Sequence, residues 1–291
     1  MNTIHVLAPA KLNLTLDVLG FRPDGYHELD MLMQAVSLCD SIEIAADTGG
    51  ARALICEDPA GNPLPDIPAD ERNLAWRAAD LFFQKTGIPD SGLSIRIVKR
   101  IPAQAGLAGG SADAAAVLRG LNALCGKPLR PKPLSELGAD CGSDVPFCIR
   151  GGTARVRGRG ERVRPVRLDP IQHYVIVKPP FGISTAALYA ASDTHIPARR
   201  PDTDALLRCL RQGDAENAGA QLCNVFEPLA VQLHPEIGQI KEALLACGAC
   251  GAQMTGSGSA VFGLFSGPDA AKRACESLKG GENAVFYAHS V

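Results

Sequence analysis

The chain has 291 residues, of which 46% are hydrophobic and 21% are charged, which is the composition of an ordinary soluble globular protein. Its 29 basic and 31 acidic side chains give a formal net charge of −2, so bulk charge supplies no attraction to nucleic acids or membranes. The N-terminus lacks the parts of a signal peptide, and no apolar stretch approaches the length of a membrane span. We expect a cytoplasmic protein with one large domain or two medium ones.

Ten cysteines are scattered along the chain, mostly inside apolar segments. Only Cys247 and Cys250 form a C-x-x-C pair, and no second pair or histidine pair lies at zinc spacing. We therefore interpret the cysteines as reduced core residues, in preference to a metal or redox site.

The first half of the chain predicts strands followed by a helix. Residues 11–18, "KLNLTLDV", alternate apolar and polar side chains without a fault, which predicts a half-buried strand with a polar face. The sequence "RPDG" at 22–25 predicts a turn. Further short strands are predicted at "SIEIA" and "SIRIVK", and residues 73–86 predict a helix that ends before Gly87.

A glycine-rich stretch then leads into a helix at 101–124, "IPAQAGLAGGSADAAAVLRGLNAL". Ser111 is placed to cap this helix, and Gly126 with Pro128 predicts its end. The spacing matches neither a Walker loop nor a dinucleotide fingerprint. A helix start with unpaired N–H groups suits a phosphate, whereas the alternative is close packing of small residues. The glycines alone leave both interpretations open.

The second half mixes strands and helices. Residues 151–166 predict a hairpin that turns at Gly158 to Gly160, and "HYVIVKPP" predicts a buried strand. Helical patterns cover 203–247, a glycine turn leads into the strand "AVFGLF", and 268–279 predicts a closing helix. The order lacks strict βαβ alternation, so we predict an α+β fold. We place the domain boundary between residues 1–165 and 166–291.

Four other residues or clusters carry possible chemistry. Lys11 could simply be a solvated lysine, and Asp144 could be a helix or turn cap. If both lie beside the glycine loop, however, they could deprotonate an alcohol and stabilise negative charge on a transferred phosphate. Tyr26 and His27 could hold a base, or be a surface aromatic and a half-buried histidine. The dense arginines at 150–167 suggest RNA binding, but we favour a solvated hairpin because no aromatics are interleaved.

Three separated stretches coincide with a known pattern: "APAKLNLTLDVLGFRPDGYHEL", "IPAQAGLAGGSADAAAVL" and "MTGSGSAVFGLF". Together they resemble the galactokinase, homoserine kinase, mevalonate kinase and phosphomevalonate kinase superfamily. The first stretch, with "GSDVPFCIRGGTARVRGRGE", is most similar to the branch that acts on 4-diphosphocytidyl-2-C-methylerythritol. The resemblance implies a two-domain α+β kinase, with an N-terminal domain of the ribosomal-protein type and a C-terminal α/β sandwich. It also implies ATP-dependent phosphorylation of the substrate's 2-hydroxyl in non-mevalonate isoprenoid synthesis.

The resemblance also implies site residues. Asp144 would be the catalytic base and Lys11 would stabilise developing charge. Residues around the ATP phosphates would be Pro102, Ala103, Gln104, Ala105, Gly106, Leu107, Ala108, Gly109, Gly110, Ser111 and Ala112, with Asn73 and Lys99 near the adenosine. Substrate contacts would come from Asn13, Tyr26, His27, Thr185, Tyr189, Ser257 and Gly258. Mg²⁺ is implied with ATP, but its ligands are not, because only Ser111 offers a hydroxyl in the loop.

Two other functions stay open at this point. One is another small-molecule kinase of the superfamily, acting on homoserine or a mevalonate-pathway alcohol; "GYHEL" opposes it, because a tyrosine beside a histidine suits a nucleotide-bearing substrate. The other is an RNA-binding protein, which the near-zero net charge opposes. We expect a small-molecule substrate, no nucleic acid or membrane partner, and a monomer or weak homodimer.

Overall fold

The computed structural model describes residues 2–46, 49–192 and 197–291. The fold divides into two compact units whose segments interleave along the chain. Unit 1 comprises Met1–Ala10, Cys39–Ile101 and Ala108–Gly151, and unit 2 comprises Lys11–Leu38, Pro102–Leu107 and Gly152–Val291. The long strands β1 (Asn2–Phe21) and β2 (His27–Ala46) contribute residues to both units. The division of the chain at residue 165 stays a prediction.

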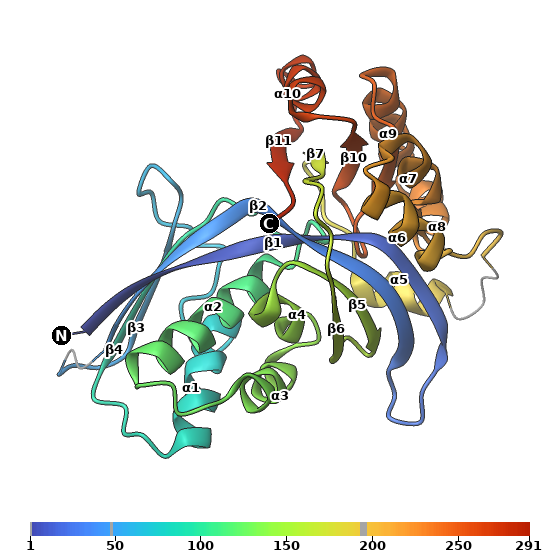
Figure 1. The fold of residues 1–291 in the computed structure, drawn as a ribbon. Coiled ribbons are helices and arrows are strands. Elements are labelled where there is room, and N and C mark those ends of the chain that lie inside the picture. Colours follow the sequence, from blue (N-terminus) through green and yellow to red (C-terminus); the bar gives the residue numbers. More distant parts are fainter. Residues whose placement is uncertain (1, 47–48, 193–196) are drawn as a thin grey trace. The chain divides into compact units, whose positions relative to one another are not determined.

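Unit 1 combines strands with a cluster of helices (Figure 1). Strand β3 (Ala53–Glu57) runs parallel to β4 (Leu93–Val98), and β4 runs antiparallel to residues 41–46 of β2. Close packing at Gly120 brings helix and strand together, since a Cβ there would lie 2.4 Å from the Ile44 side chain. The packed helices are α1 (Leu74–Thr86), α2 (Gly109–Leu124), α3 (Pro131–Cys141) and α4 (Val145–Arg150).

Unit 2 contains a hairpin, a second sheet and the remaining helices. Strand β5 (Thr153–Gly158) pairs with residues 29–34 of β2 and with β6 (Arg162–Val166), while β8 (Cys223–Asn224) runs parallel to β1. The second sheet has the order β11-β7-β10-β9. Its strands are β7 (His173–Lys178), β9 (Gly251–Met254), β10 (Val261–Phe265) and β11 (Ala284–His289).

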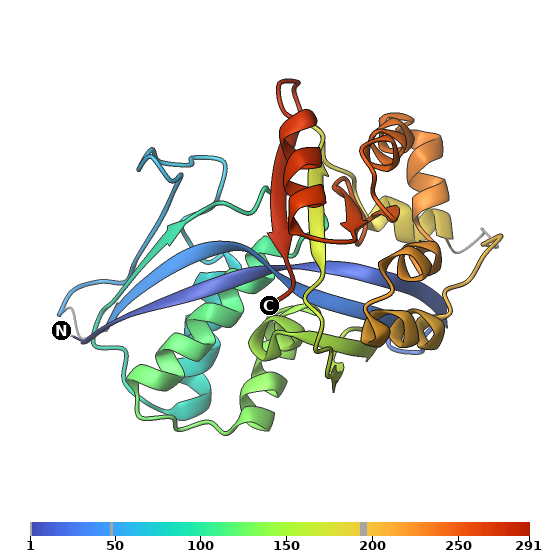
Figure 2. The same cartoon turned by 45° about the horizontal axis from the view of Figure 1, so that its top comes forward.

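Helices of unit 2 cover this second sheet (Figure 2). Helix α9 contacts β9 and β10, and α10 contacts β7 and β11. The core between them is apolar, with Tyr174, Phe262 and Phe265 almost fully buried. Among the described residues of this unit, the helices are α5 (Thr185–Ser192), α6 (Thr203–Gln212), α7 (Ala215–Gln221), α8 (Glu227–Leu233), α9 (Glu236–Ala246) and α10 (Pro268–Ser277).

Several sequence predictions are confirmed. Helix α1 begins after Asn73, whose side chain accepts from the Ala75 N–H, and it ends at Gly87, whose φ is +69°. The turn at 22–25 closes with a hydrogen bond of 3.1 Å from the Gly25 N–H to the Arg22 carbonyl. The hairpin β5–β6 and the α+β class are as predicted.

Other predictions were wrong in part. Residues 11–17 of β1 are buried on both faces, so the strand has no solvated polar face. The short helix α4 was not predicted, and α10 does not close the fold because β11 follows it. Ser111 is not the cap of α2: the N-cap is Ala108, and no side chain caps the helix there.

The thiols are reduced, but only some of them lie in the core. All ten thiols are free, four of them buried, and Cys247 and Cys250 are not joined. Among the described residues, no three histidine, cysteine or carboxylate side chains gather in a way that could hold a metal ion. Within the same ranges, none of the helices has the length and apolar character needed to cross a bilayer.

Candidate active site

The first turn of α2 offers backbone N–H donors. Ala108 precedes it with a left-handed φ of +58°, and the first helical hydrogen bond runs from the Ala112 N–H to the Ala108 carbonyl at 2.9 Å. The N–H groups of residues 109–111 therefore have no acceptor within the helix. Gly110 is exposed, and the half-buried Ser111 is the one hydroxyl in this turn. The segment suits an anion, because donors and the positive end of the helix dipole coincide.

Lys99 lies behind this turn in a buried ion-pair cluster. Its ammonium donates to Asp40 and, at 2.6 Å, to Asp113 Oδ2. Burial acts to lower the pKa of Lys99, but the two carboxylates outweigh burial and raise that pKa. Burial raises the pKa of Asp113 to about 7; Lys99 opposes this shift and Asp40 adds to it. The Lys99 ammonium, for which we predicted a place near adenosine, thus binds two carboxylates of unit 1.

Asn73 has structural contacts of its own. Its Oδ1 accepts from the Ala75 N–H at 2.9 Å, and its Nδ2 donates to the Pro68 carbonyl at 2.7 Å. The side chain is therefore the cap of α1, as the residue type favours. Its predicted place near adenosine stays a prediction.

Asp144 stands at the start of α4, half-buried. It occupies the N-cap position with a helical φ of −86°, and its side chain makes no capping hydrogen bond. The interpretation of Asp144 as a helix cap is therefore wrong, and its carboxylate is not used to begin the helix. Asp144 belongs to unit 1 and Lys11 to unit 2, so their action as a catalytic pair stays a prediction.

In unit 2, Lys11 and Asn13 lie buried on β1. The Lys11 side chain is 4% exposed, and its ammonium donates to Asn13 Oδ1. A Cβ on Gly256 would lie 3.0 Å from Lys11 Nζ, so the ammonium sits against the backbone of that turn. The Asn13 N–H donates to Thr255 Oγ1 at 3.0 Å. Lys11 and Asn13 are thereby fixed beside the glycine turn at 255–258, and their catalytic and substrate-binding roles stay predictions.

The segment 102–107 packs on the same turn. Gly106 has a φ of +71°, and a Cβ on it would lie 2.1 Å from the Thr255 carbonyl oxygen. The Ala260 N–H donates to the Ala105 carbonyl at 3.2 Å, and the Lys11 N–H donates to the Leu107 carbonyl at 3.1 Å. Glycine at 106 is required because two stretches of backbone touch. Packing of small residues, one of the two open interpretations, therefore applies to Gly106.

The predicted substrate residues form two groups within unit 2. Thr185 and Ser257 come together, with 2.6 Å between their hydroxyl oxygens. Gly258 is buried, with a φ of +81°, and a Cβ on it would lie 2.6 Å from Met254 Sδ. These contacts join the start of α5 to the turn between β9 and β10.

The second group is aromatic. The His27 ring lies 4.8 Å from the Tyr189 ring and 5.2 Å from the Phe21 ring, measured between centroids. Phe226 packs edge-on against Tyr189, at 4.8 Å. Beside these rings lies a cavity of about 480 Å³, lined by Val18, Leu19, Gly20, Phe21, His27, Ser192, Pro197, Arg200 and Val225. Sequence reasoning missed Phe226 and Arg200 because they are distant from His27 in the chain and carry no motif, and it missed Phe21 although that residue lies in the first quoted stretch.

Tyr26 does not join the aromatic group in this arrangement. Its side chain is 47% exposed, and the Arg159 guanidinium lies 5.0 Å from its ring centroid, a cation–π contact. Of the three rings predicted to hold the base, only His27 lines this cavity, and Tyr189 contacts His27 from beside it. The substrate contacts of Tyr26, His27 and Tyr189 stay predictions.

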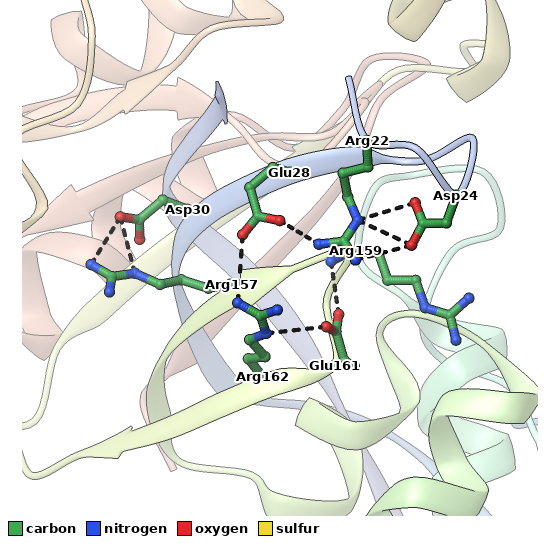
Figure 3. A network of polar contacts seen from close by, with 8 residues as sticks. All are labelled: Arg22, Asp24, Glu28, Asp30, Arg157, Arg159, Glu161 and Arg162. Atoms are coloured by element: carbon green, nitrogen blue, oxygen red, sulfur yellow. Dashed lines mark hydrogen bonds and ion pairs between the residues drawn. The ribbon is translucent and has the colours of Figure 1, made fainter. Parts of the chain in front are cut away.

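The arginine-rich hairpin is ion-paired rather than simply solvated (Figure 3). Arg155 Nη2 lies 2.7 Å and Arg157 Nη2 lies 3.3 Å from Asp30 Oδ2. Arg162 contacts both Glu28 and Glu161. The prediction of a solvated hairpin was therefore incomplete, because strand β2 supplies carboxylates that the local sequence does not show. Much of the positive charge that suggested RNA is compensated.

The residues of unit 1 fit a magnesium ion carried by a nucleotide. Mg²⁺ is usually held by substrate phosphates, water and one or two protein oxygens. The Ser111 hydroxyl lies in the first turn of α2 and can supply one such oxygen. Its Oγ would be 3.9 Å from a Cβ placed on Gly142. Asp113 does not suit the ion, because it is almost fully buried against an ammonium group.

Comparison with known proteins identifies the family. The pattern of the GHMP kinases N terminal domain matches residues 73–152, and that of the GHMP kinases C terminal domain matches residues 206–282. The 4-diphosphocytidyl-2-C-methyl-D-erythritol kinase of Pelotomaculum thermopropionicum is 45% identical over 93% of this chain and 92% of its own length. The enzyme of the same name from Exiguobacterium sibiricum is 42% identical over 98% of this chain and 96% of its own length.

Solved structures show the same relation. A crystal structure of 4-(cytidine 5'-diphospho)-2C-methyl-D-erythritol kinase has a TM-score of 0.81 and 36% identity, covering 98% of both chains. Homoserine kinase from Cytophaga hutchinsonii has a TM-score of 0.77 at 20% identity, covering 100% of this chain and 95% of its own, which shows a shared fold alone. The chain belongs to the 4-diphosphocytidyl-2-C-methyl-D-erythritol kinases, within the GHMP kinases.

Proposed function

We propose that the chain transfers the γ-phosphoryl group of ATP to the 2-hydroxyl of 4-diphosphocytidyl-2-C-methyl-D-erythritol, releasing ADP, as a step of non-mevalonate isoprenoid synthesis. The kinase names of its relatives support the reaction. The observation that carries the choice of substrate is the cavity beside His27 and Tyr189, because a planar base can stack on such rings.

Each site residue has a chemical role in this proposal. Asp144 accepts the hydroxyl proton as the oxygen attacks the γ-phosphorus and the bond to ADP breaks. Lys11 stabilises the charge that develops on the transferred group. The N–H groups at the start of α2 orient the phosphates, and Ser111 would hold Mg²⁺, which neutralises phosphate charge when bound. Thr185 and Ser257 support the substrate's polar portion.

The wider setting is part of the same proposal. Ten free cysteines favour a reducing compartment, so we place the enzyme in the cytoplasm. The ion-paired hairpin supports a protein without a nucleic-acid partner. A monomer or weak homodimer remains our prediction, and gel filtration with light scattering measures it.

The test is an ADP-release assay with ATP and a panel of acceptors. We expect turnover with the cytidyl substrate and none above background with homoserine, mevalonate or phosphomevalonate. Asp144→Asn should fold, bind both substrates and lose about 10² to 10⁴ in kcat, because asparagine cannot accept the proton. Near-normal kcat at saturating substrates would remove Asp144 as the base.

Lys11→Met supplies the companion measurement. If Lys11 and Asp144 act as one unit, the double variant should be little worse than the poorer single variant. Multiplied losses would mean that the two residues act independently and would contradict the paired mechanism.

Tyr189→Ala tests the base-binding part separately. Loss of a stacking ring should raise the KM for the cytidyl substrate about tenfold or more and leave the KM for ATP unchanged. Phe265→Leu, inside the apolar core of the second sheet, controls for general damage to unit 2. An unchanged KM in Tyr189→Ala would locate the cytosine elsewhere.

A further inference from the structure

Three charged side chains from separate elements are buried together in unit 1. Asp40 comes from β2, Lys99 follows β4, and Asp113 belongs to the first turns of α2. Their side chains are 0%, 10% and 5% exposed respectively. The Lys99 ammonium bridges the two carboxylates. A cluster of this kind is unusual, because lysine and aspartate are almost never buried unless they are paired.

Stability alone does not account for the cluster. Burying three charges costs several kcal/mol per ion before pairing, and apolar residues of similar volume often serve as well or better. One oxygen, Asp113 Oδ1, is buried and has no hydrogen-bond partner among the described residues. An unsatisfied buried acceptor adds a further cost. Buried ionic groups do, however, fix geometry, since their hydrogen bonds are directional.

The cluster contacts the residues at both ends of the glycine-rich segment 102–107. Asp40 Oδ1 accepts the backbone N–H groups of Arg100 and Ile101, directly before residue 102. At the other end, a Cβ on Gly109 would lie 3.5 Å from Lys99 Nζ and 3.2 Å from Ile101 Cγ2. The residues that precede the segment and the helix turn that follows it are therefore held by the same three side chains.

We propose that Asp40, Lys99 and Asp113 are positioning residues for nucleotide binding: they hold residue 101 and the first turn of α2 in the arrangement that the ATP phosphates require. The inference rests on the proposed function, because it assumes that ATP binds at this turn. It assigns Lys99 a role behind the loop, acting through the backbone and without a direct contact to the base. The net charge of the cluster is at most one negative charge, so Lys99 also keeps two carboxylates from repelling the phosphates.

The first variant to test is Asp113→Asn, which keeps the shape and one oxygen acceptor for Lys99 but removes a charge. Lys99→Met is the stronger change, because it leaves two carboxylates without their cation. Arg96→Met is the matched control: Arg96 lies on β4, the strand that precedes Lys99, and its half-exposed side chain pairs with Glu57 instead of Asp40 or Asp113. Calorimetric titration with a non-hydrolysable ATP analogue gives the affinity, and thermal unfolding shows whether each variant folds.

We expect the KM for ATP and the Kd for the analogue to rise about tenfold in Asp113→Asn, and more in Lys99→Met, with kcat and the KM for the cytidyl substrate within about threefold. Arg96→Met should match the wild type. A purely structural role would lower the fraction of folded enzyme without moving the KM for ATP. Unchanged ATP affinity in folded Asp113→Asn would overturn the inference.

Failure of this inference is distinguishable from failure of the proposed function. If the wild type turns over the cytidyl substrate while the variants keep its ATP affinity, only the positioning role is contradicted. If the wild type does not bind the ATP analogue, the proposed function is contradicted as well. If Lys99→Met does not fold, Asp113→Asn still decides, because the change from aspartate to asparagine is nearly isosteric.

Discussion

The segment 102–107 and the first turn of α2 are neighbours in the chain and share a glycine-rich sequence, yet they are held in different ways. In the segment, Gly106 is fixed by backbone contact, because any side chain would strike the Thr255 carbonyl. In the helix turn, Gly110 is exposed, and ordinary contact distance separates a Cβ there from Leu74. The turn is held instead from behind, by the charges of Lys99 and Asp113.

Glycines in this one motif therefore serve two different structural requirements, backbone packing and open access to the helix start. A glycine with positive φ and crowded surroundings answers a packing demand, and its replacement damages the fold. A glycine in helical conformation with open surroundings lowers the stability of the helix relative to alanine. Its presence there is explained by another requirement, such as the close approach of a ligand. Substitutions at the two places should therefore differ in kind.

Gly106→Ala should have the largest effect. Its Cβ would lie 2.1 Å from a backbone oxygen, at a φ of +71° that L-residues rarely adopt. Left-handed strain of about 1 to 2 kcal/mol and overpacking of about 1 to 3 kcal/mol together predict a loss of roughly 2 to 5 kcal/mol of unfolding free energy. Urea denaturation measures it. A loss below 1 kcal/mol would mean that the segment can move away from the turn at 255.

Asp113→Asn tests whether buried charge supports the first turn of α2, through the dependence of stability on pH. The folded pKa of Asp113 is about 7, above the unfolded value of 3.8, so its contribution to stability is fully present below pH 4 and is lost as pH rises through 7. Lys99, Asp40 and the Cys56 thiol are the titratable groups that face it. The free energy of unfolding of the wild type, relative to Asp113→Asn, should fall by on the order of 1 kcal/mol per pH unit between pH 5 and 7.

Parallel pH curves for the two proteins would contradict this prediction. Denaturant titrations at several pH values suffice, because the titrating groups that do not face Asp113 are common to both chains and cancel in the difference. The sign is also diagnostic: a difference that is flat between pH 5 and 7 and grows as pH rises only below about pH 4 would mean that Lys99 holds Asp113 ionised throughout.

Much of the fold could be predicted from local sequence, because local patterns carry it. Alternation marked the strand at 11–18, the glycine and proline residues marked the hairpin and turns, and Asn73 and Gly87 marked the ends of α1. The six-residue helix α4 was missed, since it is too short for a period to show. Burial of both faces of β1 depends on what packs against the strand, which its own alternation does not reveal.

The roles of the candidate site residues stay predictions, but the contacts that support these residues are observed and were not predicted. Local motifs singled out Lys11, the glycine loop and the His27 region as candidates, because each carries a local signature. The cluster around Lys99 joins residues 59 and 14 positions apart in the chain, and the hairpin pair Arg155–Asp30 joins residues 125 positions apart. Such pairs are invisible to a single sequence, since nothing local distinguishes these aspartates from ordinary surface carboxylates. Ser111 was assigned as a cap from residue type alone, and the helix begins two residues earlier.

Gly110→Ala tests the glycine in the first turn of α2. The position is helical and exposed, so alanine should raise the free energy of unfolding by up to about 1 kcal/mol. If the turn receives phosphate, the new methyl group should at the same time raise the KM for ATP severalfold. Stability and affinity would then move in opposite directions, which Gly106→Ala cannot do. A stabilised variant with unchanged KM would leave Gly110 without a ligand role.

Ala108→Gly isolates backbone conformation from crowding, and its two opposing contributions leave a small net effect on stability. Ala108 has a φ of +58° and Gly106 a φ of +71°, so the two positions are conformationally alike. Relief of left-handed strain favours glycine by about 1 to 2 kcal/mol, while the more flexible unfolded chain opposes it by about 0.4 to 1 kcal/mol. We expect a net gain of less than about 1.5 kcal/mol in urea denaturation. If conformation were the whole demand, Gly106→Ala would cost only what Ala108→Gly gains; any excess measures the contact with Thr255. Equal magnitudes would therefore remove the packing role of Gly106 and make the two halves of the motif alike.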